Sequence, residues 1–179
     1  MASFSDRVIG AAALRVSTYE EVEADTSATG QAVAVVVLSS LAAGLPFIRY
    51  DGIRGLLGGT TAALVAWFVL AALIVGIGTR ILPEPQTKSD LGELLRTLGF
   101  AASPGLLMVV GVVPGVGGIL GLVVWLWMLA ATVLAVRQAL DYKSTGRAVA
   151  VCVIGFVVSY MVRYLINLVL GLGGLALAF

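Results

Sequence analysis

The chain has 179 residues, of which 60% are hydrophobic and 12% are charged, and its mean hydropathy is +1.06. These values lie far outside the range of soluble domains, so we expect the bilayer to be the solvent of this chain. The formal net charge of +1 offers no basic surface for nucleic acid. Because the sequence has no His and a single Cys, Cys152, it excludes an internal disulfide and a His/Cys metal site.

Five apolar stretches predict an all-α fold, a polytopic membrane helical bundle with five transmembrane helices and short amphipathic interfacial helices. We expect a cytoplasmic N-terminal arm, residues 1–29, with amphipathic and acidic helices, followed by a membrane domain, residues 30–179. The expected spans cover about residues 30–48, 58–79, 101–113, 115–136 and 148–170. A span needs ~20 residues to cross a core of ~30 Å, so the third is marginal.

The N-terminal arm shows two helical patterns. In residues 1–15 a helix could lie in the membrane interface or belong to a partly ordered arm, since one of its sides carries Phe4, Val8, Ala11 and Ala12. Residues 17–21 fit the spacing of a capping box, so a short helix should follow through Asp25. Consecutive helical positions point outward and cannot converge on one cation, so the acids of residues 20–25 predict a solvated face.

Residues 79–105 form a long polar interruption between the second and third spans. Pro83 and Pro85 end the second span. Beyond them we expect an amphipathic helix on the membrane surface, because leucines recur at helical spacing: Leu91, Leu94, Leu95 and Leu98. Residues 114–118, with the sequence PGVGG, predict a tight turn that joins the third and fourth spans into a helical hairpin.

The distribution of Lys and Arg predicts the orientation of the chain in the cell (inner) membrane. With a cytoplasmic N-terminus, the opposite side holds Arg49 and Arg54 only. The cytoplasmic segments then hold the other basic residues outside the spans, namely Arg7, Arg15, Arg80, Lys88, Arg96, Arg137, Lys143 and Arg147. This asymmetry favours five spans with an extracytoplasmic C-terminus.

Three stretches resemble a bacterial member of the Yip1-domain membrane proteins: TYEEVEADTSATGQA at 18–32, ELLRTLGFAASPGLL at 93–107 and VRQALDYKSTGRAV at 136–149. The similarity covers most of residues 15–165 and implies a five-span bundle with a cytoplasmic N-terminus. Eukaryotic relatives are associated with Rab-type GTPases and with the organisation of secretory-pathway membranes. This chain lacks their DLYGP-type motif and has only a short N-terminal arm. The resemblance brings no catalytic or binding residues to this sequence.

One charged residue, Arg163, falls inside a predicted span. It lies ~22 Å along a crossing of ~30 Å, and residues at i−4, i−3 and i+4 share its face. The resulting candidate polar stripe for a lipid or anion consists of Ser159, Tyr160, Arg163 and Asn167. In one interpretation Arg163 extends to the outer headgroups, and in the other it faces the bundle interior and binds a lipid phosphate, an anionic solute or a partner's carboxylate.

Two functions follow from these patterns. The first is a non-catalytic membrane scaffold or accessory subunit of a larger membrane assembly, without a cofactor or metal. The alternative is a channel or transporter for a small solute, ion or lipid that uses the stripe around Arg163. The apolar residues 168–179, which the fifth span does not need, favour contact with a second copy or another subunit. We expect no enzyme, because the acids lie in surface segments and no His accompanies them.

Overall fold

The computed structural model describes residues 2–113 and 115–169, with side chains as far as residue 161 except that of residue 51. Within these ranges the chain forms helices and no strands, which confirms the all-α prediction. The elements are α1 (Phe4–Ala12), α2 (Val16–Ala24), η1 (Thr26–Ala28), α3 (Thr29–Gly44), η2 (Leu45–Phe47), α4 (Ile48–Arg80), α5 (Leu91–Ala101), η3 (Ser103–Val112), α6 (Gly117–Ala139) and α7 (Thr145–Val169).

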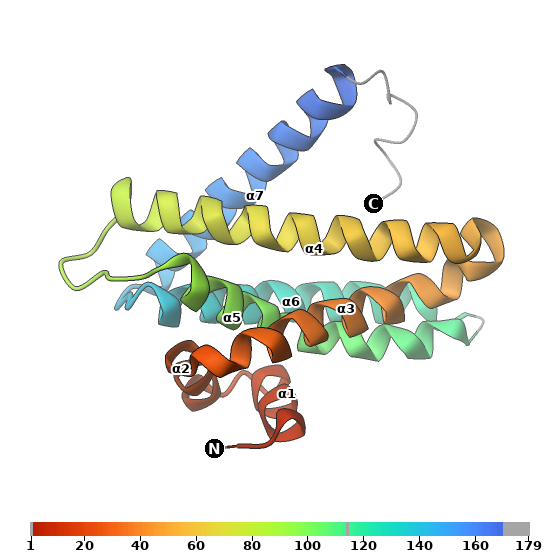
Figure 1. Cartoon of the computed structure of the whole chain (residues 1–179), viewed down its shortest axis with the longest axis horizontal. Helices are drawn as coiled ribbons and strands as arrows, with labels where there is room; N and C mark the ends of the chain where they lie inside the picture. Colours follow the sequence, from red (N-terminus) through yellow and green to blue (C-terminus); the bar gives the residue numbers. More distant parts are fainter. Residues whose placement is uncertain (1, 114, 170–179) are drawn as a thin grey trace.

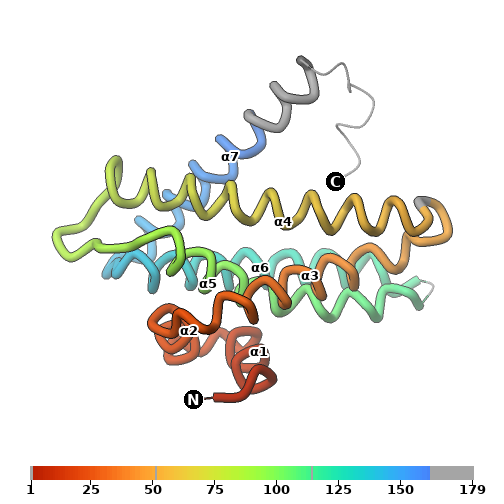
Figure 2. Tube along the Cα trace, viewed as in Figure 1, coloured from red at the N-terminus to blue at the C-terminus, as the bar shows by residue number. Residues whose placement is uncertain are grey.

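The long helices α3, α4 and α6 and the segment α5–η3 run side by side as one bundle (Figure 1). The turn at residues 45–52, the end of η3 and the start of α6 lie at one end of this bundle, and the connections 81–90 and 140–144 lie at the other. The helices α1 and α2 pack on one side of the bundle. On the opposite side α7 leaves at an angle to α4 (Figure 2).

Four helical segments are long and apolar enough to cross a membrane: Thr26–Tyr50, Gly52–Arg80, Leu91–Val112 and Gly117–Ala139. They show a multi-pass membrane protein. The apolar part of α7 within the searched residues, Thr145–Met161, is shorter than these four. The fifth span therefore stays a prediction, and the apolar residues 170–179 lie outside the described part of the chain.

The residues between the first two predicted spans, 49–57, are helical and contain a kink. α4 begins at Ile48, and its one non-helical residue among those described is Gly52, with φ 61° and ψ −169°. A side chain is disfavoured at this φ, so glycine permits the sharp change of direction. The predicted turn at 114–118 is confirmed at Gly115, which has φ +84° and lies between η3 and α6.

The helix predicted to lie on the membrane surface, α5, packs inside the bundle instead. Leu94, Leu98 and Phe100 are buried, and α5 contacts α2, α3, α4 and α6. The physical reason is that an apolar stripe fits neighbouring helices as well as lipid. Asp90 caps this helix in a capping box with Glu93. The apolar helical segment that could cross the membrane here, Leu91–Val112, therefore includes α5 as well as the predicted third span.

Small residues bring α3 close to α5 and η3. A Cβ added to Gly99 would lie 2.7 Å from the Cβ of Ala32, and one added to Gly105 would lie 3.1 Å from the Cβ of Ser39. The hydroxyl of Ser39 also donates to the carbonyl of Ala102 at 2.8 Å. Close backbone approach through small residues and a polar contact is the common way of packing helices in lipid.

The half of the bundle beside the turn at residues 45–52 is more open between α4 and α7. The buried residues of α7, within its described side chains, are Ala148, Val151, Cys152 and Gly155. Gly155 packs on the side chains of Ile74 and Leu70 of α4. No residue of α4 from 52 to 70 is buried, and residues 156–161 of α7 are exposed or half-buried. These segments therefore present uncovered apolar faces.

Candidate functional site

The predicted stripe on α7 is only partly visible in the structure. Ser159 is half-buried, and its hydroxyl oxygen has no hydrogen-bond partner among the described residues. Tyr160 is exposed. The side chains of Arg163 and Asn167 lie outside the described side chains. That these four side chains share one face of α7 therefore stays a prediction.

The most extensive polar cluster involves Arg7, a residue that the sequence interpretation did not single out. The side chain of Arg7 is only 2% exposed, although it belongs to the short N-terminal helix α1. It donates hydrogen bonds to Glu21 at 2.9 Å, to Asp25 at 2.6 Å and to Gln31 at 3.1 Å. Because a buried guanidinium must be paired, these contacts hold α1 against α2 and the start of α3.

The acids of residues 20–25 are therefore not all part of a solvated face. The Arg7 guanidinium, followed by the amide of Ala2, holds the pKa of Glu21 below its usual value. The hydroxyl of Ser27 and then Arg7 do the same for the pKa of Asp25. The opposite charges on α1 and α2 were the one feature of the sequence that could have indicated this pairing. A basic residue on α1 needs an acidic neighbour once the two helices pack.

The turn between α1 and α2 is tight, with Leu14 at φ 56°. Residues 17–21 do not form the predicted capping box. The N-cap of α2 is Arg15, which makes no side-chain capping bond. The capping box of the arm lies instead at Ser3 and Asp6, at the start of α1. On the predicted apolar side of α1, Ala11 is buried and Val8 packs against the core, whereas Phe4 is exposed.

Two further residues attach this arm to the bundle. Arg96 of α5 is 6% exposed and donates from its guanidinium to the carbonyls of Val22 and Glu23, the first at 3.0 Å. Trp127 of α6 donates from its indole Nε1 to the carbonyl of Ala12 at 2.7 Å. The carbonyls at a helix C-terminus lack partners within the helix, and these side chains satisfy several of them.

Glu23 stands apart from the other acids of the arm. Its carboxyl is half-buried, and burial, helped by the charges of Glu93 and Asp141, raises its pKa to about 7. Arg96 acts in the opposite direction on this pKa. The junction between arm and bundle therefore contains a group that titrates near neutral pH.

A second polar cluster joins the connections 81–90 and 140–144 at the same end of the bundle. The carboxylate of Glu84 accepts from the amides of Lys143 at 2.9 Å and Ser144 at 3.4 Å, just before α7 begins. The first of these bonds is the main cause that lowers the pKa of Glu84. Tyr142 is buried and donates from its hydroxyl to the carbonyls of Gly78 and Leu82 at 3.0 and 2.7 Å. Together they fix the start of α7 against the end of α4.

The three stretches that carry the family resemblance meet in these clusters. Arg96, from residues 93–107, bonds the acidic arm, and Gln138, from residues 136–149, donates to Glu20 of that arm at 3.2 Å. Within the described residues no group of three His, Cys, Asp or Glu side chains could hold a metal ion. The polar contacts among the described residues connect segments that are distant in the sequence.

These features define an all-helical, multi-pass membrane protein with a short helical arm docked on its bundle. The sequence model of the Yip1 domain matches residues 15–166. The chain therefore belongs to the Yip1 domain family, a family of membrane proteins that is not known for catalysis. Searches of curated proteins and of solved structures gave no match.

Proposed function

We propose that this chain is a bacterial, non-catalytic membrane protein of Yip1 type that acts as a scaffold or accessory subunit of a larger membrane assembly. It crosses the inner membrane five times, with the N-terminus in the cytoplasm. The orientation is supported by the basic residues. The connections 81–90 and 140–144 lie at one end of the bundle and contain Lys88 and Lys143, and Arg80, Arg137 and Arg147 lie within three residues of them in the sequence, which favours the cytoplasm for that end.

The observation that carries the scaffold proposal is the open arrangement of α4 and α7. Gly155 contacts Leu70 and Ile74, but beyond this point neither residues 52–70 of α4 nor residues 156–161 of α7 contain a buried side chain. Helices that carry a pathway for a solute need polar lining residues. These two segments present mostly apolar faces, which suit a transmembrane helix of another subunit or of a second copy.

The first experiment is gentle extraction of the native protein and measurement of the mass and composition of what emerges. A fixed stoichiometry with another protein, or a defined homo-oligomer without flux in liposomes, supports the scaffold. A closed homo-oligomer that conducts a solute would replace it with the alternative, a channel or transporter. In that case substitution of Arg163 would test whether the predicted stripe forms the pathway.

A pair of variants makes this experiment specific. Ala66 is exposed and lies one turn from Leu70 on the side of α4 that faces α7, whereas Ala72 is exposed on the opposite side of the same helix. The substitution Ala66→Trp should reduce the assembled fraction because it fills the open region. Ala72→Trp, the matched control, should leave assembly unchanged. Equal effects of the two variants would contradict a contact at the α4–α7 opening.

A further inference from the structure

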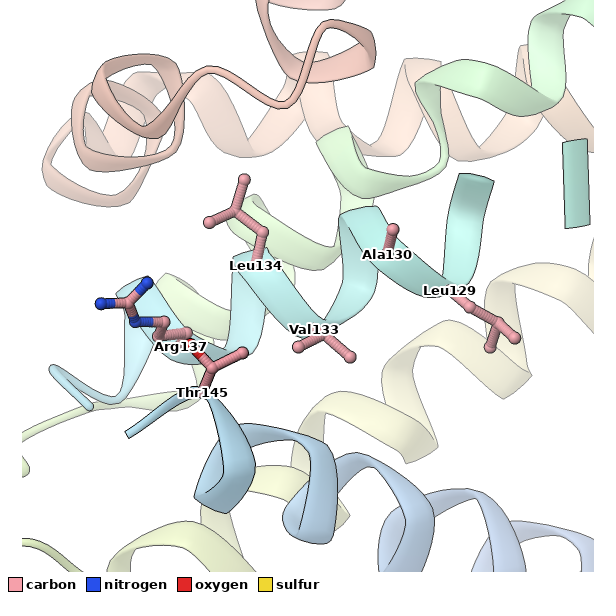
Figure 3. Close-up of a pocket in the computed structure, with 6 residues that line it drawn as sticks. All are labelled: Leu129, Ala130, Val133, Leu134, Arg137 and Thr145. Carbon is pink, nitrogen blue, oxygen red and sulfur yellow. The ribbon is translucent and has the colours of Figure 1, made fainter. Parts of the chain in front are cut away.

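A shallow depression lies between α6 and the first turn of α7, next to the second polar cluster described above. Its volume is about 370 Å³. Figure 3 shows that Arg137 and Thr145 lie together at one end and that Leu129 lies at the other. The remaining lining residues are apolar: Ala130, Val133 and Leu134. The depression is thus lined by apolar side chains along most of its length and has one charged end.

The dimensions of this depression suit one leaflet of a bilayer. Residues 129 and 137 are separated by about 12 Å along α6, at about 1.5 Å per residue. Half of the hydrocarbon core is about 15 Å thick. Arg137 lies in the last turn of α6 and reaches the polar end of the bundle. A molecule in the depression would therefore have its apolar part at membrane depth and its polar part at the surface.

The guanidinium of Arg137 is held in place and still has free donors. Its Nε donates to the carbonyl of Tyr142 at 3.2 Å, and Tyr142 is itself fixed by its hydroxyl bonds to Gly78 and Leu82. No hydrogen bond or ion pair of its two terminal nitrogens is formed with the described part of the chain. A guanidinium with its terminal nitrogens free is suited to bind a phosphate through two parallel hydrogen bonds.

We propose that this depression binds an anionic phospholipid. One acyl chain lies along Leu129, Val133 and Leu134, and the phosphate accepts hydrogen bonds from Arg137 and from the hydroxyl of Thr145. Charge complementarity selects this occupant, because its phosphate supplies an anion at Arg137 while its acyl chain covers the apolar lining residues. A soluble anion would make no contact with the apolar side chains that line the depression. This inference requires only a multi-pass membrane protein and does not depend on the scaffold function.

The test counts lipid molecules that remain bound to the full-length protein in detergent micelles, by native mass spectrometry. Phosphatidylglycerol is compared with phosphatidylcholine of the same acyl chains. The wild-type protein should retain one phosphatidylglycerol in preference to phosphatidylcholine. Substitution Arg137→Gln should weaken this retention by about tenfold, the effect of losing one charged contact, and Arg137→Lys should have an intermediate effect.

Two matched controls separate the site from general attraction of lipid to basic residues. Lys143 is exposed at the same end of the bundle and does not line the depression, so Lys143→Gln should retain lipid as the wild type does. Ala130→Trp fills the depression without a change of charge and should reduce retention, whereas Ala150→Trp on the exposed side of α7 should not. Helix content measured by circular dichroism shows whether each variant is folded.

Three results would overturn the proposal. Retention of both lipids to the same extent would show binding of bulk lipid only. Equal losses in Arg137→Gln and Lys143→Gln would show that net charge, rather than this depression, attracts the lipid. Complete displacement of phosphatidylglycerol by millimolar inorganic phosphate would show a soluble anion site, in which the apolar side chains that line the depression have no part.

Discussion

Arg7 and Asp25 form an ion pair of 2.6 Å that joins the first helix of the chain to the end of the second. The arginine is nearly inaccessible, and the carboxylate is 14% exposed. This pair closes the α1–α2 hairpin, and Arg96 then fixes the hairpin to α5 through the carbonyls of Val22 and Glu23. The N-terminal arm is therefore a structural part of the bundle.

The arm should lose its fixed position when Arg7 is replaced by leucine. The variant leaves Glu21 and Asp25 without their cation and Gln31 without a donor. We expect the melting temperature to fall by about 4–8 °C, because hydrogen bonds to charged groups each contribute about 1.5–3 kcal/mol. Hydrogen exchange of the amides of residues 4–12 should also become faster.

The matched control for this prediction is Arg15→Leu. Arg15 is exposed in the same arm, and its side chain makes no hydrogen bond or ion pair with the described residues. It should change neither the melting temperature nor the exchange of α1. If Arg15→Leu destabilised the protein as much as Arg7→Leu, the buried pairing would not be the cause.

The docked arm should be most stable in mildly acidic solution. The pKa of Glu23 is raised from 4.5 to about 7 in the folded protein, so the stability that its protonation confers is lost as pH rises from 4.5 to 7. The pKa values of Glu21 and Asp25 are lowered, so their contribution is present above their ordinary pKa values and is lost as pH falls below them. The two effects leave a maximum at about pH 4.5, because stability falls above it through Glu23 and below it through Glu21 and Asp25.

The variant Glu23→Gln tests the loss of stability that is expected as the pH rises above this maximum. Glutamine is neutral at every pH, so it mimics the protonated acid. At pH 8 the variant should melt about 2–5 °C above the wild type, a small effect because the half-exposed carboxyl is screened by solvent. At pH 4, below the ordinary pKa of 4.5, the two proteins should melt together. A constant difference between them at both pH values would exclude titration of Glu23 as the cause.

The sequence predicted an all-helical membrane protein, because an apolar helix long enough to cross a bilayer is a local property of some twenty consecutive residues. It did not predict the burial of Arg7, since that depends on a turn at Leu14 with φ 56°, for which the sequence has no glycine signal. It placed α5 on the membrane surface because the stripe of Leu94 and Leu98 gives the same pattern against lipid as against helices. Hydrophobic periodicity shows which side of a helix is apolar, but it does not show whether lipid or another helix covers that side.

The contact between α3 and α5 should not tolerate a larger residue at Gly99. A Cβ at this position would lie 2.7 Å from the Cβ of Ala32 and 3.1 Å from its backbone, which cannot move aside as a side chain can. We expect Gly99→Val to destabilise the protein by about 2–4 kcal/mol, measured by thermal unfolding in detergent. Gly76→Ala is the control, because nothing lies within 4 Å of its added Cβ and it should be neutral or slightly stabilising.

The hydroxyl of Tyr142 should contribute to the attachment of α7. The substitution Tyr142→Phe removes the hydroxyl proton that the carbonyls of Gly78 and Leu82 share, without a change in the shape of the ring. We expect a loss of about 1–2 kcal/mol and faster hydrogen exchange at the start of α7. Tyr160→Phe, on the exposed part of α7, should have no effect. An unchanged stability of Tyr142→Phe would mean that water replaces the hydroxyl at both carbonyls.

The two ends of the bundle should be accessible from opposite sides of the membrane. Tyr50 is 86% exposed at one end and Lys143 is exposed at the other, so each can be replaced by cysteine in a Cys152→Ala background. An impermeant maleimide should label position 50 in intact cells and position 143 only after permeabilisation, because three spans separate them. The reverse pattern would place the N-terminus outside. Labelling of both positions from the same side would show that one of the segments Gly52–Arg80, Leu91–Val112 and Gly117–Ala139 does not cross the bilayer.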